Sequence, residues 1–448
     1  MNEGNRHPIV TDGKLADSPG VACARVAGDN RAGGRVSFPL HFRGRILRLV
    51  LIHFTVANRF ASAIPASHST SFRRHFSFFV MSSYSVSRRR VTLGLLSVLL
   101  AAVAGLSLAI GAIPTGLWEA LARLPAAVGL ILSPHAPPQF DAAGAADADQ
   151  LAMVVAEIRL PRLLLGVLTG AGLALCGALM QGLFRNPMAD PGLLGVSSGA
   201  ALGAVAAIVL GGQWLARLDA ELAATVAAWL LPGAAFGGGL ACLFVVHRLS
   251  VAGGKTDIAT MLLAGIAVSA IAGAAIGLLS YIADDAQLRD LIFWSLGSLQ
   301  ITDWRKLTAA MVCVLPMLLI LPRFANALNA NLLGEREAGH LGIDMERIKR
   351  RLIVGVALVV GVIVSLTGVI GFVGLVVPHL LRIVIGPDHR LLLPASALFG
   401  AALLVAADIV ARSAVAPAEI PIGIITALLG GPFFLYLLVR FHRAHTLP

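Results

Sequence analysis

The stretch with the clearest chemical potential is VAGGKTD, at residues 251 to 257. Gly254, Lys255 and Thr256 match the end of the nucleotide-binding pattern G-x-x-x-x-G-K-[ST], in which backbone N–H groups and the lysine hold phosphates. Leu249 stands where the first glycine of that pattern should be, and long apolar runs flank the stretch where the pattern needs a strand. We therefore expect a polar loop with one positive charge, and no ATP site in this chain.

Metal or haem-iron ligation is the second chemistry that single residues invite. His379 lies beside a Gly/Pro-rich interruption and Met180 lies within an apolar run, and neither has a second ligand at a recognisable spacing. Such a histidine is usually held by hydrogen bonds, and a methionine in an apolar span usually packs. The four cysteines also lack metal-ligand spacing. The sequence predicts no metal site, no bound cofactor and no catalytic residue.

The elements that carry these residues belong to a membrane protein. The chain has 448 residues, of which 57% are hydrophobic and 13% are charged, which is more apolar than one soluble core requires. Its net charge of +11 is concentrated at the start, because residues 1–90 hold 14 Lys+Arg and 4 Asp+Glu. The remaining residues are close to neutral, so the body of the protein carries no charge signal for nucleic-acid binding.

The N-terminal segment, residues 1–80, is predicted to be disordered or to be an overextended reading frame. It mixes Gly, Ser, Arg and His, and its apolar patch ILRLVLIHF is too short to cross a bilayer. Met81 then opens a short basic segment followed by a long apolar one. We expect the mature protein to begin at Met81 and residues 81–448 to form one transmembrane domain. A cleaved signal peptide over residues 88–113 is the alternative, although that apolar run is long for one.

Nine apolar segments approach the roughly 20 residues that a membrane crossing needs. Lysine and arginine accumulate on the cytoplasmic side of a membrane, so charge orients the loops. The basic run Arg88 to Arg90 places the start of the first span inside, and the alternation of loops holds through the seventh span. The basic C-terminal stretch VRFHRAH also belongs inside, which nine spans do not allow. The nine segments lie near residues 91–113, 163–184, 191–212, 222–247, 258–281, 306–322, 352–376, 391–411 and 421–440.

A short tenth crossing, PHLLRIVIG, resolves this conflict. It is entered through the interrupted stretch GFVGLVVPH, and a similar interruption, FRNPMADPGLLG, joins the second and third spans. Irregular backbone at membrane depth is tolerated where protein or a water-filled cavity covers it, so two such elements, one in each half, indicate an internal duplication with a pathway nearby. The residues predicted to break the helices near the pathway are Asn186, Pro187, Pro191, Gly371, Gly374 and Pro378.

Two loop regions are candidate contact sites for partners. On the inside, NLLGEREAGHLGIDMERIKRR predicts a short helix, a turn at Gly342 and a second, charged helix that could fit a groove on a partner; an ordinary basic loop is the alternative. On the outside, Arg159, Arg162 and Arg412 stand at span ends and could receive carboxylates of a soluble partner. The alternative is local pairing, which the i, i+4 spacing favours for Asp408 and Arg412.

Several long motifs, in this order, resemble one family of transport proteins. They are RLPRLLLGVLTGAGLALCGALMQGLFRNPMADPGLLGVSSGAALGA, LLAGIAVSAI, WSLGSL, GFVGLVVPHLLRIVIGPDHRLLLPASALFGA, ADIVAR and EIPIGIITALLGGPFFLYLL. The chain from about residue 91 onward is similar to the FecCD-type permeases of ABC importers for ferric siderophores, haem and cobalamin. The resemblance implies an all-α integral membrane protein with ten transmembrane helices and two broken or re-entrant elements, the type II ABC importer permease fold.

The resemblance also implies partners and roles for particular residues. It implies a homodimer in the bacterial inner membrane, with both termini cytoplasmic, two separate ATPase subunits that use the ATP, and a periplasmic substrate-binding protein. Gly334, Glu335, Ala338 and Gly342 match the coupling loop that seats in the ATPase. The arginines Arg159, Arg162 and Arg412 match outward-facing residues that meet acidic groups on the binding protein.

The substrate implied by the resemblance is haem. The stretch MQGLFRNPMADPGLLGVSSGAALG is most similar to the haem permeases of the family. A ferric siderophore or cobalamin permease is the alternative within the family. A secondary transporter driven by an ion gradient is a distant alternative, because it would need intramembrane carboxylates and Asp408 is the one strong candidate.

Overall fold

The computed structural model describes the backbone of residues 70–111, 152–300, 303–416 and 418–445 and of short pieces between 117 and 129. Side chains are described from residue 87 onward within these ranges, except at residues 117, 120, 252, 437, 438 and 440–445. The account below concerns the unit Ser82–Pro448, taken by itself. The predicted N-terminal extension lies almost wholly outside the described residues, so a start at Met81 stays a prediction.

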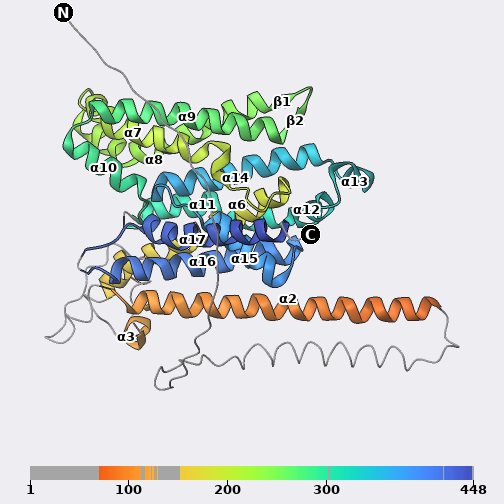
Figure 1. The fold of residues 1–448 in the computed structure, drawn as a ribbon. Coiled ribbons are helices and arrows are strands. Elements are labelled where there is room, and N and C mark those ends of the chain that lie inside the picture. Colours follow the sequence, from red (N-terminus) through yellow and green to blue (C-terminus); the bar gives the residue numbers. More distant parts are fainter. Residues whose placement is uncertain are drawn as a thin grey trace, which may run out of the picture. The chain divides into compact units, whose positions relative to one another are not determined.

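This unit is a bundle of long helices with very little strand (Figure 1). Its two short strands, β1 (Val251–Ala252) and β2 (Lys255–Thr256), pair as an antiparallel hairpin. One π-helical turn, η1 (Val155–Arg159), and two 3-10 turns, η2 (Pro191–Leu194) and η3 (Leu321–Phe324), adjoin helices. The α-helices are α2 (Thr70–Ala109), α3 (Leu117–Ala122), α6 (Leu160–Leu183), α7 (Val196–Leu215), α8 (Ala220–Ser250), α9 (Ile258–Ile282), α10 (Asp285–Ser295), α11 (Trp304–Ile320), α12 (Ala325–Asn331), α13 (Glu335–His340), α14 (Met345–Thr367), α15 (Val373–Ile385), α16 (His389–Ser413) and α17 (Ile422–His445).

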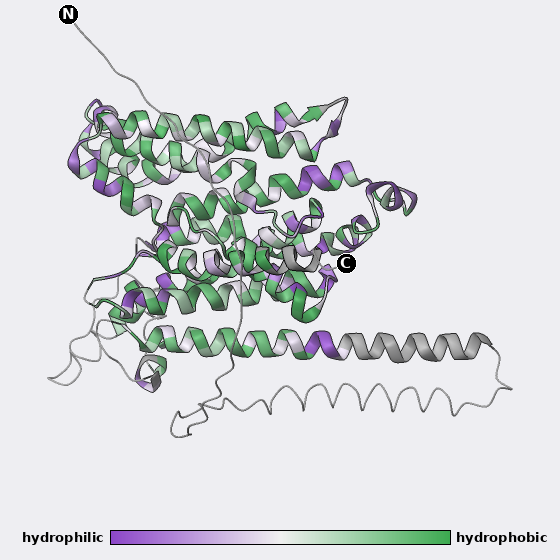
Figure 2. Cartoon of the chain, viewed as in Figure 1, coloured by the Kyte–Doolittle hydropathy of each residue, from purple (hydrophilic) through white to green (hydrophobic). Residues whose placement is uncertain are grey.

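Eight of the helices in the described part of the chain are long and apolar enough to cross a membrane. Two shorter apolar helices, Val373–Ile385 and Ile422–Tyr436, correspond to the predicted tenth crossing and to the last of the nine predicted segments. Figure 2 shows hydrophobic residues along the lengths of the helices and hydrophilic residues gathered at their ends. That distribution is expected of helices surrounded by lipid, which has no water to satisfy polar groups.

Helix α6 is the centre of the bundle. In the span that contains α6, 89% of the most apolar 18-residue stretch is buried, whereas only 11% of the corresponding stretch is buried in α2 and in α9. Glycines allow the neighbouring helices to approach it closely: Gly170 lies against the backbone of Gly400 in α16, and Gly177 lies against the backbone of Gly374 in α15. Small residues at such crossings let membrane helices associate through backbone packing.

Aspartates begin many of the helical segments. Six Asp side chains accept a hydrogen bond from a backbone N–H of the first turn, which satisfies a donor that the helix itself leaves unpaired. These carboxylates therefore have a structural role in starting helices. They are Asp190, Asp257, Asp284, Asp303, Asp344 and Asp388.

The bundle has two ends that differ in their elements. The hairpin end carries β1, β2, α12 and α13, and the last part of α17 and the basic start of α14 lie there as well (Figure 1). Arg88 also lies at this end, because it donates a hydrogen bond to Val384 O near the end of α15. The arginine end, at the opposite side, carries α10 and the side chains of Arg159, Arg162 and Arg412.

Candidate functional site

Helix α13 is the short helix predicted as the partner-contacting loop, and its boundaries are set by two glycines. Gly334 precedes the helix with φ +128, and Gly342 follows it with φ +79, both in the region that favours glycine. Ala338 is fully buried and belongs to a small cluster with Ala330 and Met345. The predicted order of short helix, glycine turn and charged second helix is confirmed.

The side chain of Lys349 connects α13 to α14 and to the hairpin. Lys349 Nζ lies 2.8 Å from Glu335 Oε1 and 3.8 Å from Glu346 Oε2, although the lysine side chain is only 6% exposed. It also lies 3.5 Å from Thr256 O in β2. Glu346 Oε1 in turn accepts hydrogen bonds from the N–H and the hydroxyl of Thr256. One buried cation therefore joins three elements at the hairpin end.

The VAGGKTD stretch is the turn of the hairpin. Gly253 and Gly254 have φ values of +58 and +75, and Ala252 pairs with Lys255, so the turn has two residues with positive φ, as in a type I′ hairpin. A two-residue turn cannot wrap a phosphate, and Lys255 lies in a strand instead of at a helix start. The prediction of a polar loop with an exposed charge is confirmed.

The backbone N–H of Asp257 donates to Ser250 O at the base of the hairpin, and its carboxylate starts α9. It accepts hydrogen bonds from the N–H and the hydroxyl of Thr260. These hydrogen bonds, with a smaller contribution from the nearby Lys349 charge, hold the pKa of Asp257 below its usual value. Asp257 is therefore ionised at neutral pH.

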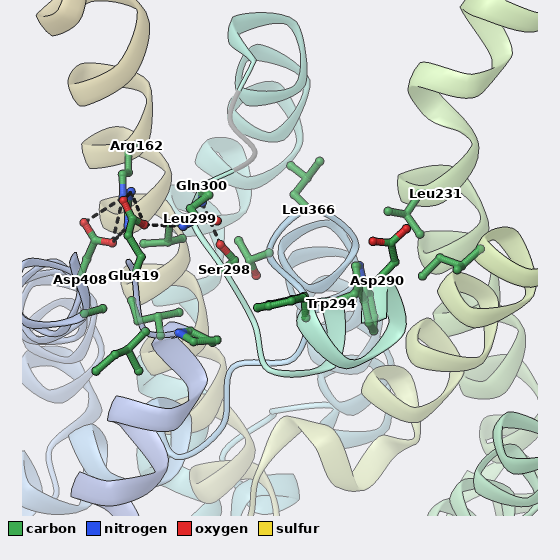
Figure 3. A pocket seen from close by; sticks show the side chains of 17 residues that line it. Arg162, Leu231, Asp290, Trp294, Ser298, Leu299, Gln300, Leu366, Asp408 and Glu419 are labelled. Atoms are coloured by element: carbon green, nitrogen blue, oxygen red, sulfur yellow. Dashed lines mark hydrogen bonds and ion pairs between the residues drawn. The ribbon is translucent and has the colours of Figure 1, made fainter. Parts of the chain in front are cut away.

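At the arginine end, Arg162 is the centre of an ion-pair cluster (Figure 3). Its guanidinium donates to both carboxylate oxygens of Asp408, with Nη2 to Oδ1 at 2.8 Å and Nε to Oδ2 at 3.2 Å. It also lies 2.9 Å from Glu419 Oε2, and Gln300 donates to that same oxygen at 2.6 Å. The predicted pair of Asp408 and Arg412 is confirmed at 3.4 Å, but Arg162 is the closer partner of Asp408.

The other two arginines hold the end of α2. Arg159 is 5% exposed, and its Nη1 donates to Leu108 O at 2.5 Å. Arg412 donates to Ile110 O at 2.5 Å and to Ser107 O at 2.6 Å. The last carbonyl groups of a helix have no partner within the helix, so cations at this position both satisfy them and complement the helix dipole. These two residues therefore fix the first span against α6 and α16.

All three arginines that were predicted to dock a soluble partner are thus used inside this chain. The side chains of Arg162 and Arg412 are 13% and 8% exposed, and Arg159 is buried. A docking role stays a prediction, and in this arrangement it would require Arg162 or its neighbours to exchange an internal partner for an external one.

A cavity of about 380 Å³ opens beside the Arg162 cluster. In Figure 3, the Arg162, Asp408 and Glu419 side chains lie on one side of it, and Asp290 and Leu231 lie on the other. Its remaining lining is largely apolar, with contributions from the turn after α10 and the end of α14. The cavity is therefore an apolar space with charged groups at its rim.

The first predicted interruption lies between α6 and α7. Arg185 has φ +51, and Asn186 Oδ1 accepts a hydrogen bond from the N–H of Met188 across Pro187. Pro191 is the first residue of η2, where Asp190 caps the turn. The helical path of the second and third spans is therefore broken where the sequence predicted it.

The second interruption contains one of its three predicted residues, Gly371. The helix stops at Thr367 and restarts at Val373, with Gly371 and the αL residue Phe372 between them, whereas Gly374 and Pro378 lie inside α15. A proline inside a helix frees the carbonyl four residues before it, here that of Gly374.

Gln181 of α6 compensates for that proline. Its Nε2 lies 3.4 Å from Gly374 O and 3.2 Å from Leu375 O, and its Oε1 accepts a hydrogen bond from Arg382 at 2.9 Å. A neighbouring side chain that satisfies freed carbonyls is what lets proline persist in membrane helices. Gln181, Lys349 and Glu419 were not singled out from the sequence, although a glutamine inside an apolar span was a visible signal.

The residues considered as metal ligands have structural surroundings. Met180 is fully buried in the core, and the His379 ring lies edge-on to Phe433 at 6.3 Å. In the residues that the structure describes, no group of three or more His, Cys, Asp or Glu side chains is placed to hold a metal ion.

Comparison with known proteins assigns the class. The model of the FecCD transport family matches residues 99–440, and the chain belongs to this family. It is 49% identical over 284 residues to the hemin transport system permease of Yersinia pestis, a match that covers 63% of this chain and 82% of that protein. It is 46% identical over 286 residues to the cobalamin import system permease of Halobacterium salinarum, covering 64% and 73%.

Solved structures agree with this assignment. A metal-chelate type ABC transporter in an inward-facing conformation aligns with a TM-score of 0.64 and 33% identity, over 78% of this chain and 98% of that one. The chain is therefore a permease subunit of an ABC importer and is not itself the ATPase. A permease of this class works with an ATPase and a substrate-binding protein, and ATP is used by that separate subunit.

Proposed function

We propose that this chain passes haem across the bacterial inner membrane as the permease subunit of an ABC importer. The observation that carries the substrate is the 49% identity to a hemin permease, compared with 46% and 42% to two cobalamin permeases. Because the identities to the hemin permease and to the first cobalamin permease, 49% and 46%, differ so little, cobalamin import is the second candidate. A ferric siderophore is the third substrate class. The assembly is a homodimer with two ATPase subunits and one periplasmic binding protein.

The hairpin end faces the cytoplasm in this proposal. The start of α14 reads MERIKRR, and Arg88, Arg89 and Arg90 precede the apolar part of α2 at the same end, as the preference of Lys and Arg for the cytoplasmic side requires. We infer ten crossings, made by the eight long apolar helices together with α15 and α17. An even number of crossings places both termini in the cytoplasm.

Helix α13 is the contact for the ATPase. The helix is short, bounded by Gly334 and Gly342, and anchored by buried Ala338 and by the ion pair of Glu335, so it can move as one rigid piece. ATP binding closes the ATPase dimer, and this closure displaces α13. The displacement of α13 then opens the path. The interrupted segments at Asn186 to Pro191 and between Thr367 and Val373 lie near that path.

The arginine end faces the periplasm and receives the binding protein. Arg162 lines the cavity described above and is therefore well placed to exchange Glu419 for a carboxylate of the partner. Arg159 and Arg412 contribute by holding α2 and the rim in place.

Deleting the gene in its host tests the substrate. We expect loss of growth on haem as sole iron source, with growth on ferric siderophores and in a cobalamin-dependent medium unchanged, and restoration by the plasmid-borne gene. Normal growth on haem with loss in the cobalamin-dependent medium would replace haem by cobalamin and leave the importer class intact.

Substitution of Glu335 and Gly342 tests the role of α13. We expect Glu335→Ala and Gly342→Val to abolish uptake while the amount of permease in the membrane stays normal. Arg347→Gln is the matched control, because it removes an exposed ion pair with Asp344 in the first turn of α14. Unchanged uptake in the Glu335 and Gly342 variants would refute the role of α13 as the ATPase contact.

A further inference from the structure

The hairpin end contains a buried lysine that touches elements from three parts of the chain. Lys349 lies on α14, Glu335 lies on α13, 14 residues earlier, and Thr256 lies on β2, 93 residues earlier. The lysine is paired with Glu335 at 2.8 Å and lies 3.5 Å from Thr256 O. Through these two contacts, Lys349 connects α13 with the hairpin directly.

Burial makes this arrangement demanding. Only 6% of the lysine side chain is exposed, whereas Glu335 is 42% exposed and Glu346 is 25% exposed. A buried ammonium group is costly unless carboxylates pair with it, so Lys349 holds its partners close. If α13 is displaced, Glu335 moves, and the lysine must either follow it or lose its nearest counter-charge.

The hairpin is attached to the same lysine from the other side. Glu346 accepts two hydrogen bonds from Thr256, one from its N–H and one from its hydroxyl, and stands 3.8 Å from Lys349 Nζ. Beyond Thr256 the tip of the hairpin, Gly253 to Lys255, is exposed. A hypothetical Cβ on Gly253 or Gly254 would meet no atom within 4 Å, so no other element packs against the tip at these two positions.

We infer that Lys349 is a positioning residue that joins α13 to the β1–β2 hairpin, so that a displacement of α13 is carried to the hairpin tip. The inference depends on the proposed function in one respect, because the ATPase is what displaces α13. The connection itself belongs to this chain and exists without a partner.

Spin-label mobility at the hairpin tip tests the connection in the permease alone. A nitroxide is placed at Lys255→Cys in the full chain, with the four native cysteines replaced by alanine, and the protein is reconstituted in lipid nanodiscs. Three variants weaken the connection at different points: Glu335→Gln on α13, Lys349→Met at the centre and Thr256→Val on the hairpin. Thr256→Val removes the hydroxyl bond to Glu346 and leaves the backbone bonds of Thr256 in place. Arg347→Gln again removes an exposed ion pair in the same turn of α14 and is the control.

We expect the label to be more mobile than in the wild type in all three variants, and as mobile as in the wild type in the control. The telling variant is Glu335→Gln, because its side chain lies on a different element from the label. The double variant Glu335→Gln with Lys349→Met should be no more mobile than Lys349→Met alone, since both cut one chain of contacts. An unchanged spectrum in Glu335→Gln, or effects of the two substitutions that add, would overturn the inference.

Transport measurements then separate this inference from the proposed function. These measurements use proteoliposomes of the permease with its ATPase. Lys349→Met should lower haem uptake per ATP hydrolysed by about tenfold, which is a usual size for coupling between two sites. The ATPase should still bind to this variant. Increased mobility together with an ATPase that does not bind α13 would refute the proposed ATPase contact and leave the connection standing. Full uptake by Lys349→Met would refute a role of the connection in transport.

Discussion

Replacing Arg162 with glutamine separates the internal role of this residue from its predicted docking role. Arg162 donates three hydrogen bonds to Asp408, at 2.8, 3.0 and 3.2 Å, and a further one to Glu419 at 3.0 Å. The Asp408 side chain is 3% exposed. When the guanidinium is removed, the nearest remaining cation for Asp408 is Arg412, at 3.4 Å.

The size of the effect follows from which carboxylate is left without a partner. Glu419 is 28% exposed and can be hydrated after the substitution, so it adds little to the cost. Asp408 cannot, and removing one partner of a buried ion pair typically costs 3–5 kcal/mol, so we expect about 3 kcal/mol with Arg412 still close. The double variant Arg162→Gln with Asp408→Asn removes the stranded charge and should recover about 2 kcal/mol of that loss.

Unfolding and uptake, measured together, decide between the two roles. The single and double variants are purified in detergent and their unfolding free energies compared, with the exposed Arg305→Gln as the control at the same end. Binding-protein-dependent uptake is measured in proteoliposomes. If Arg162→Gln unfolds like the wild type but loses uptake, then the internal ion pair contributes nothing and docking is its role.

Substitutions at Gly177, Gly342 and Gln181 test the packing and turns that surround the site. Gly177→Val should prevent folding, because its side chain would overlap the backbone of Gly374, whereas Gly273→Ala, which would meet no atom within 4 Å, should leave the amount of folded protein in the membrane unchanged. Gly342→Ala should cost about 1–2 kcal/mol for a left-handed backbone at φ +79, and Gly342→Asn should cost less; urea unfolding measures both. Gln181→Leu should cost about 1–3 kcal/mol, because the carbonyl of Gly374 loses its side-chain donor, and a wild-type melting temperature would contradict the role of Gln181.

The sequence by itself determined the class of the protein and most of its course through the membrane. Apolar runs near 20 residues leave few alternatives to a helix, because lipid cannot satisfy backbone polar groups. Charge then orients the loops, and glycine marks turns such as that at Gly342, where φ is positive. These signals are local, so they can be read without knowing which helices meet. The family motifs added the partners for the same reason, since they are contiguous stretches.

Tertiary structure decided which charges face one another. The i, i+4 spacing of Asp408 and Arg412 was readable along one helix, but the closer partner, Arg162, lies 246 residues away. Lys349 appeared to be one more basic residue of a cytoplasmic loop, and only the fold buries it against Glu335 and Thr256. A long-range ion pair leaves no periodic signal in the sequence of either partner.

Contacts between helices likewise determined where the helix is interrupted in the second half of the chain. Proline predicts a break at Pro378, yet the helix continues through it because Gln181, on α6, supplies the hydrogen bond that the proline removes. Of the predicted residues only Gly371 lies in the break, which separates the end of α14 at Thr367 from the start of α15 at Val373. Local propensity states what a residue costs within its own helix, and only the packed bundle determines whether another helix offsets that cost.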